Sequence, residues 1–279
     1  MPEINETTEI QSTTADVRPS SKNFSGNVIP YHNAKIIKET LENGSSPLLP
    51  KDGVLAPESI YNARTGYILP AQTLIPAQIM KAERGFESNI VSDAWNMKAA
   101  GTQKKQLEKG IMYNFLKEDK EGQGKSRIST STLYFADQSE HPDKVAAYAA
   151  EHYLKDKKKL EGISIEVKSA DDYLTAYLAA AKSGVTVKVS PEVTDAFKQK
   201  MIEICDKQFK HDRFKEKGSP LHDYLFDCDK KSVDMVKEIA KANNIDLSPK
   251  QKEQENKVEQ KKPEKKDRRV NREEMSMVF

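Results

Sequence analysis

The feature that most constrains this chain is the confinement of its apolar periodicity to the middle of the sequence. Residues from Met1 to about Asn27 are rich in Ser, Thr, Asn and Glu, and the tail that starts near Ser248 is dominated by charged and polar residues. Neither end carries an apolar stripe that would hold it against a core. We therefore expect a disordered arm over 1–28, a charged disordered tail over 248–279, and a folded region between them.

The charge balance does not by itself indicate a nucleic-acid-binding protein. The 45 Lys and Arg residues nearly cancel the 43 Asp and Glu residues, which leaves a formal net charge of +2. Any basic surface must therefore arise from the way in which the charges are distributed over the fold.

Three absences predict an intracellular protein. No apolar run approaches the roughly 20 residues of a membrane-spanning helix. The polar, acidic start of the chain lacks the basic and apolar regions of a signal peptide. Two cysteines in a chain of this length do not suggest a disulfide framework. We expect a cytoplasmic location and no membrane partner.

Two helices are predicted early in the folded region. The stretch from Asn33 to Asn43 places its apolar residues on one face and stops at Gly44, a residue that commonly terminates helices. Apolar residues resume between Leu69 and Met80, which predicts a second helix that ends near Gly85. Pro76 limits where that helix can begin.

A short helix and a β-hairpin are predicted next. Ser92 is expected to cap a helix that contains Trp95 and Met97 and ends at Gly101. Two β-strands are predicted over Ile111–Leu116 and Ser129–Phe135, and the charged segment between them is predicted to be a long hairpin loop.

The second half of the folded region has mainly helical periodicity. We predict short strands at 163–167 and 185–189. Helices are predicted over 142–154 and 173–182, and a long helix is predicted to start at Ser190-Pro191-Glu192. Two further short helices are predicted around Tyr224 and over 233–242. The fold class is α+β. A small helix–hairpin domain is expected over 29–140, and a mostly helical region is expected over 141–247.

The order of these signals from Ile36 to about Gln138 resembles the N-terminal domain of ArdC antirestriction proteins. That family has an amphipathic helix that ends in a Leu-Glu-x-Gly phrase, which here is Leu41-Glu42-Asn43-Gly44. An Asn-x-x-Thr-Gly turn follows, here from Asn62 to Gly66, and Lys109-Gly110 opens the β-hairpin. The resemblance implies a domain that binds single-stranded DNA, in a protein encoded by a plasmid, an integrative element or a phage.

The sequence also departs from that family. Leu48 and Leu49 stand where the family's loop usually carries tryptophans, and the segment from Tyr67 to Ala71 replaces a Tyr-x-Gly-Ile-Asn phrase. Full-length members often continue into a zinc metallopeptidase domain with a His-Glu-x-x-His motif. Glu151-His152 and His222-Asp223 lack the second histidine at the required spacing. We therefore predict no catalytic residues, no cofactor and no metal.

Four lysines, Lys98, Lys104, Lys105 and Lys109, follow Trp95 and precede Tyr113. Lysines neutralise phosphates and aromatic rings stack on exposed bases, which is the combination that a single strand requires. The alternative is a solvated lysine face above an aromatic core, because most aromatic residues serve as core. For the turn around Arg64 and Tyr67, the alternative is an ordinary turn with an exposed arginine. The predicted nucleic-acid-binding residues are Arg64, Tyr67, Trp95, Lys98, Lys104, Lys105, Lys109, Tyr113 and Arg127.

The spacing of Cys205, His211, His222 and Cys228 is symmetric, as it would be in a candidate zinc site. Zinc ligands usually come as close pairs, and the spacing of each Cys–His pair here is at the upper limit. Cys205 also falls on the apolar stripe of a helix, where a cysteine usually acts as a small core residue. A Cys–His nucleophile would lack a third group to orient it. Both interpretations are weaker than core packing.

The leading hypothesis is a non-catalytic accessory protein of a mobile element that binds single-stranded DNA, with proteins of a restriction or DNA-transfer system as further partners. The alternative is a protein-interaction module that keeps the fold but has lost DNA binding. The missing loop tryptophans and the nearly neutral charge favour this alternative.

Overall fold

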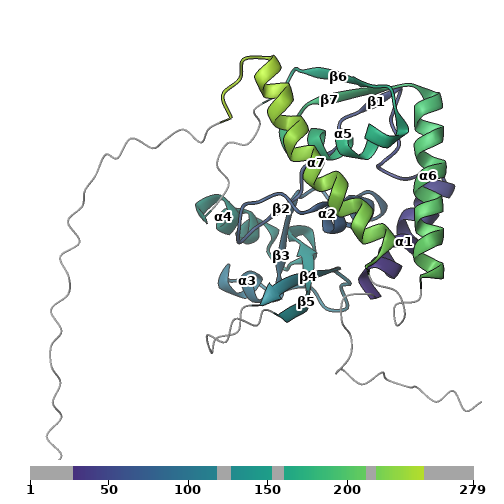
Figure 1. Cartoon of the computed structure of the whole chain (residues 1–279). Coiled ribbons are helices and arrows are strands. Elements are labelled where there is room, and N and C mark those ends of the chain that lie inside the picture. The colour runs from purple at the N-terminus through teal and green to yellow at the C-terminus, as the bar shows by residue number, and fades with distance from the viewer. Residues whose placement is uncertain (1–27, 118–126, 153–159, 212–217, 248–279) are drawn as a thin grey trace, which may run out of the picture. The chain divides into compact units, whose positions relative to one another are not determined.

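The computed structural model describes residues 28–117, 127–152, 160–211 and 218–247. The predicted disordered arm except for its last residue, Val28, the predicted tail, and the hairpin loop over 118–126 lie outside these residues. The described residues up to Asp246 form one compact unit (Figure 1). Its elements, in chain order, are α1 (Val28–Glu42), β1 (Val54–Leu55), β2 (Tyr61–Asn62), α2 (Ala71–Arg84), β3 (Ile90–Asp93), α3 (Ala94–Ala99), β4 (Ile111–Lys117), β5 (Arg127–Phe135), the 3-10 helix η1 (Ala136–Gln138), α4 (Pro142–His152), β6 (Ser164–Val167), α5 (Ala170–Ser183), β7 (Thr186–Val189), α6 (Pro191–Lys210) and α7 (Pro220–Ala242).

The predicted α+β class is confirmed, and the strands form two separate sheets. The larger sheet has the order β2-β3-β5-β4, in which only the β2–β3 pair is parallel. The smaller sheet has the order β1-β7-β6, in which β6 and β7 are parallel and are connected through α5. A parallel pair needs such a crossover, whereas the antiparallel β4–β5 pair is a hairpin.

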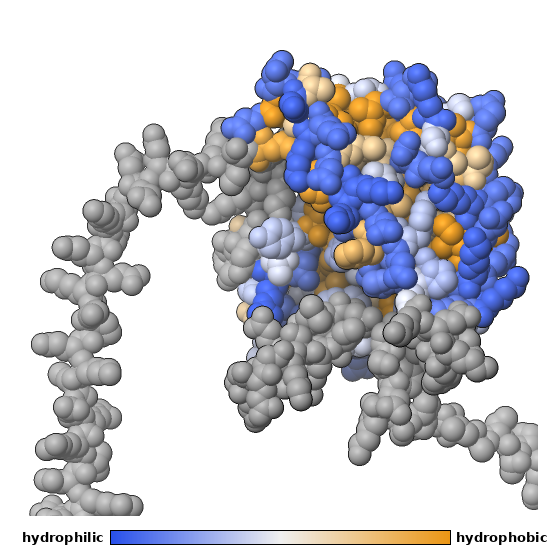
Figure 2. Space-filling view, viewed as in Figure 1, coloured by the Kyte–Doolittle hydropathy of each residue, from blue (hydrophilic) through white to orange (hydrophobic). Residues whose placement is uncertain are grey.

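One hydrophobic cluster spans most of the unit. It contains fully buried side chains from α1 and α2, from β5, and from α5 and α6, among them Ile37, Leu74, Phe135, Tyr177 and Phe197. A smaller cluster lies around Met97 and Val145, on α3 and α4. Figure 2 shows that hydrophilic side chains dominate the outer surfaces of α6 and α7, as expected for helices with one buried face.

Local signals account for several helix ends. Gly85 and Gly184 adopt the left-handed conformation that closes α2 and α5. Ser190 caps α6 by accepting a hydrogen bond from the backbone of Val193, and Pro191 follows it at the first helical position. These ends agree with the sequence predictions within a residue or two.

Three predicted element boundaries are wrong. Ser92 does not cap α3: it lies within strand β3, and the cap is Asp93, whose side chain accepts from the Asn96 backbone N–H. The two short helices predicted after residue 219 are one continuous helix, α7, because nothing in the sequence between them breaks a helix. The first helix begins at Val28, before the predicted start at Asn33.

The described helices include none that is both long enough and apolar enough to span a bilayer.

Candidate nucleic-acid interface

The candidate interface begins at the carboxyl ends of β2 and β3. These strands are parallel, with Tyr61 opposite Ile90 and Asn62 opposite Val91. The Ala63 backbone N–H extends the pairing by donating to the Val91 carbonyl over 2.8 Å. Because parallel strands end at the same edge of a sheet, the turn that follows β2 and the helix that follows β3 emerge next to each other.

The turn after β2 is held by its own polar groups. The Asn62 side-chain oxygen accepts from the backbone N–H groups of Arg64, at 2.9 Å, and Thr65, at 3.3 Å. The Gly66 N–H donates to the Asn62 carbonyl over 2.8 Å, and Gly66 has a positive φ of 63° that a side chain would disfavour. This asparagine-centred turn presents Arg64 and Tyr67 on the surface, and Tyr67 is 71% exposed.

The helix after β3 displays Trp95. Asp93 caps it through the Asn96 backbone N–H at 2.8 Å and also accepts from the Asn96 side-chain amide at 2.7 Å. Met97 is fully buried in the smaller hydrophobic cluster and anchors α3 to the sheet. The opposite side of the helix faces solvent, so Trp95 is 78% exposed.

The exposure of these rings decides between two of the sequence interpretations. The aromatic-core alternative is wrong for Trp95, because its side chain does not pack into a core. Tyr67 is exposed as well, and for its turn the alternative of an ordinary turn with an exposed arginine stays open. Lys98 is also exposed, and it follows Trp95 by three residues on the same helix. Residues at this spacing lie on one helix face, which places a cation next to the indole.

Tyr113 has an intermediate position. It lies on β4 opposite Ser131 of β5 and is partly buried against the main core. Burial raises the pKa of its phenol, and the nearby Asp93 carboxylate raises this pKa further. A hydrogen bond with Ser131 and the positive charge of Arg64 act in the opposite direction. Arg64 and Asp93 therefore both lie within electrostatic range of Tyr113.

The remaining predicted lysines belong to a second group, around η1. The Lys104 ammonium lies 5.6 Å from the centre of the Tyr134 ring. The Lys105 ammonium donates to the Asp137 carbonyl over 2.9 Å, and the Lys109 carbonyl accepts from the Gln138 amide over 2.9 Å. These contacts tie the loop before β4 to η1.

The structure thus divides the predicted site residues into two groups. Arg64, Tyr67, Trp95, Lys98 and Tyr113 lie at or near the carboxyl end of the β2–β3 pair, and we call them the β2–β3 edge surface. Lys104, Lys105 and Lys109 lie at η1, next to the opposite end of β3. Arg127 starts β5 opposite Lys117, at the end of the hairpin, and its side chain is outside the described part.

Sequence reasoning missed some surface residues. Asp93 was not assigned a role, although it both caps α3 and influences Tyr113. Leu107 is 96% exposed in the loop before β4 and has a positive φ of 61°. Met112 is partly exposed on β4. An isolated apolar residue in a polar loop gives no periodic signal, so the pattern could not identify Leu107 as a surface feature.

The four residues of the candidate zinc site have other surroundings. Cys205 and Cys228 are buried free thiols, and burial raises the pKa of Cys205 to about 12. A ring nitrogen of His211 lies 2.9 Å from the Gly218 carbonyl oxygen, and His222 stacks with Phe226. Among the described residues, no group of three or more His, Cys, Asp or Glu side chains is arranged to hold a metal ion.

Comparison of the sequence with protein-family models and with curated proteins finds no match. Comparison with solved structures finds the antirestriction protein ArdC from plasmid R388, which is the family that the sequence resembles. Its metal-free structure has 12% sequence identity and a TM-score of 0.47, and the match covers 76% of this chain and 98% of that chain. The Mn(II)-bound structure has 14% identity and a TM-score of 0.48, with 76% and 97% covered. Values of this size carry no conclusion about activity.

Proposed function

We propose that this protein binds single-stranded DNA through the β2–β3 edge surface and acts as a non-catalytic accessory protein of a mobile element. The observation that carries the proposal is the exposure of Trp95 and Tyr67, two large rings on rigidly capped elements. Stacking of a base on such a ring contributes about 1–3 kcal/mol and tolerates any base, because every base has a π-face.

The charges near the rings support the same proposal. Arg64 precedes Tyr67 in the turn, and Lys98 follows Trp95 on α3, so each exposed ring has a cation close to it in the chain. Both Arg64 and Lys98 are exposed and could neutralise phosphates. Tyr113 completes the surface, and burial raises the pKa of its phenol.

The second group of cations would extend the path of the strand. Lys105 and Lys109 are exposed next to η1, and Lys104 covers one face of Tyr134. Arg127 would contribute at the hairpin. We assign these four residues to phosphate contacts, which position a strand but do not distinguish its bases.

The biological context rests on the sequence resemblance to ArdC proteins, which implies a plasmid, an integrative element or a phage. Proteins of a restriction or DNA-transfer system are the partners that this context suggests. The protein would coat or protect incoming single-stranded DNA by electrostatics and stacking, with no reaction of its own.

A protein-interaction module is the second candidate function. Leu48, which stands where the resembled family carries a loop tryptophan, is fully buried, so this position offers no ring to a base. Exposed Trp and Tyr side chains are also common as anchors of protein–protein interfaces. In this candidate, the β2–β3 edge surface would bind a protein.

The intrinsic fluorescence of the protein tests the first function directly, because Trp95 is the only tryptophan in the sequence. We expect saturable quenching of its emission when an oligothymidylate is added at low salt, and weaker binding at high salt. A blunt duplex of equal length serves as the control and should quench less. Unchanged emission at low salt, with no binding of a labelled oligonucleotide, would favour the interaction module.

A further inference from the structure

A groove of about 790 Å³ lies on a part of the molecule that the proposed function does not use. One wall is the segment 44–58, which includes β1, and the other is the C-terminal half of α2. Tyr177 of α5 lies at its buried side. The volume falls within the range of about 300–1,000 Å³ that is typical of ligand sites. We call this feature the α2 groove.

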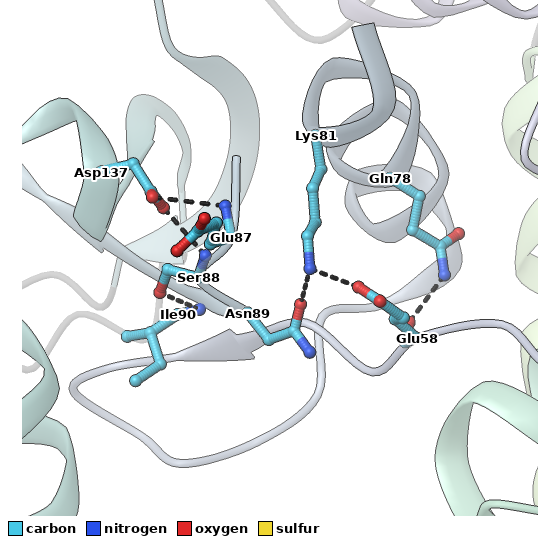
Figure 3. A network of polar contacts seen from close by, with 8 residues as sticks. All are labelled: Glu58, Gln78, Lys81, Glu87, Ser88, Asn89, Ile90 and Asp137. Carbon is cyan, nitrogen blue, oxygen red and sulfur yellow. Dashed lines mark hydrogen bonds and ion pairs between the residues drawn. The ribbon is translucent and has the colours of Figure 1, made fainter. Parts of the chain in front are cut away.

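A polar network fixes the distance between the two walls. The Tyr177 hydroxyl donates to the Gln78 side-chain oxygen over 2.9 Å, and the Gln78 amide donates to the Glu58 carbonyl over 2.7 Å. Lys81 bridges the Glu58 carboxylate and the Asn89 side chain (Figure 3). Because Tyr177 and Gln78 are buried and fully engaged, they brace segment 44–58 against α2 and keep the groove in shape.

Ala56 lines the groove, and its backbone has no partner among the described residues. The Gly53 carbonyl accepts from the Val189 N–H over 3.0 Å, and β1 pairs antiparallel with β7. Alternate residues of such a strand point their N–H and C=O groups away from the partner strand, here Val54 and Ala56. The Val54 N–H donates to the Lys51 carbonyl, and the Val54 carbonyl accepts from the Lys51 N–H. The Ala56 N–H and C=O form no hydrogen bond with any described residue.

The side chains around Ala56 suit an extended peptide. Leu49, Val54 and Phe86 line the groove and are not fully buried, so they provide apolar contacts for alternate side chains of a bound strand. Lys51 is exposed on the rim and forms no ion pair with the described residues, whereas Lys81 is already paired with Glu58. The rim therefore carries an unneutralised positive charge.

We propose that the α2 groove binds a short extended segment of a partner protein. The segment pairs with the backbone of Ala56 and places an acidic side chain near Lys51. This is strand addition, in which main-chain hydrogen bonds contribute affinity and side-chain pockets contribute specificity. The inference does not rest on DNA binding.

The first experiment screens the full chain against a synthetic library of randomised seven-residue peptides. We expect the selected peptides to share Asp or Glu at one position. One backbone nitrogen of the bound peptide should pair with the Ala56 carbonyl. Methylation of this nitrogen should lower the affinity of the best peptide about three- to tenfold, as expected for the loss of one hydrogen bond. Selection of no peptide above background, or of peptides without a shared acidic position, would overturn the proposal.

Matched variants locate the binding. Ala56→Pro removes the N–H donor but keeps an extended backbone, whereas Ala56→Ser keeps the donor. Lys51→Glu should shift the selection towards Lys or Arg, and Lys241→Glu on the exposed side of α7 should leave it unchanged. Equal peptide binding by Ala56→Pro and Ala56→Ser would contradict the proposed pairing.

Oligonucleotide binding of each folded variant is measured in parallel. We expect it to remain at the wild-type level, since none of these residues lies on the β2–β3 edge surface. A failure of peptide binding can thus be told apart from a failure of the proposed DNA function.

Discussion

The Asn33 side-chain amide in α1 donates a hydrogen bond to the Gln72 carbonyl in α2 over 3.0 Å. This carbonyl would normally accept from the residue four positions later, but that residue is Pro76, which has no N–H. The interior proline is therefore tolerated because a neighbouring helix satisfies the carbonyl that it leaves unpaired.

Asn33→Ala should destabilise the fold, because Asn33 is buried and the Gln72 carbonyl would lose its donor. We expect a loss of about 1–3 kcal/mol in the free energy of unfolding, measured with urea. Pro76→Ala restores an N–H at the right position, so the cost of Asn33→Ala should be smaller in that background. Equal costs in both backgrounds would show that the proline and the asparagine are not coupled.

Trp95→Ala should separate binding from stability. The side chain is 78% exposed, so its removal should change the unfolding free energy by no more than about 0.5 kcal/mol. Affinity for a labelled single strand should fall by about 1–3 kcal/mol. Met97→Ala, two residues away on the same helix, is the contrasting variant. Because Met97 is fully buried, its replacement by alanine should lower the free energy of unfolding by about 2–5 kcal/mol.

The double variant Arg64→Ala with Lys98→Ala should flatten the salt dependence of single-strand binding. Each neutralised phosphate contributes about −0.7 to the slope of the logarithm of the binding constant against the logarithm of the salt concentration. Two lost contacts should therefore reduce the magnitude of this slope by roughly 1.4. Lys241→Ala, which removes an exposed charge from α7, should not change the slope. A double variant with the wild-type slope would remove these two residues from the proposed surface.

Stability should fall as the pH rises above about 9, partly because of Cys205. Burial raises the pKa of this thiol from 9.0 to about 12. Between these values the unfolded thiol loses its proton and the folded thiol keeps it, so a rising pH favours unfolding. Between pH 8 and 10, the free energy of unfolding should fall by about 1 kcal/mol less in Cys205→Ala than in the wild type. Urea titrations at each pH measure this difference.

Met201→Ala is the control for this comparison. Met201 is equally buried on α6 but does not titrate, so its variant should be less stable at every pH and should show the wild-type pH slope. The same slope in Cys205→Ala and in wild type would exclude Cys205 as a source of the pH dependence.

The sequence by itself determined the elements whose signals are local. The cap at Ser190, the glycine ends of α2 and α5, and the hairpin of β4 and β5 depend on residues close together in the chain. Such signals act through backbone conformation and short-range hydrogen bonds, so they are readable without a fold. The α+β class followed from them. The domain boundary near residue 140 stays a prediction.

Only the tertiary structure decided which distant segments meet and which rings are exposed. The two residues of β2 are too few to give a periodic signal. Strand β3 was not predicted, because its residue Ser92 was interpreted as the cap of the following helix. Their parallel pairing, which places the turn with Arg64 next to the start of α3, depends on contacts across the chain. Trp95 and Tyr173 have similar aromatic character in the sequence, yet one is 78% exposed and the other is fully buried. Burial is a property of the packed neighbours, and these are chosen by the whole fold.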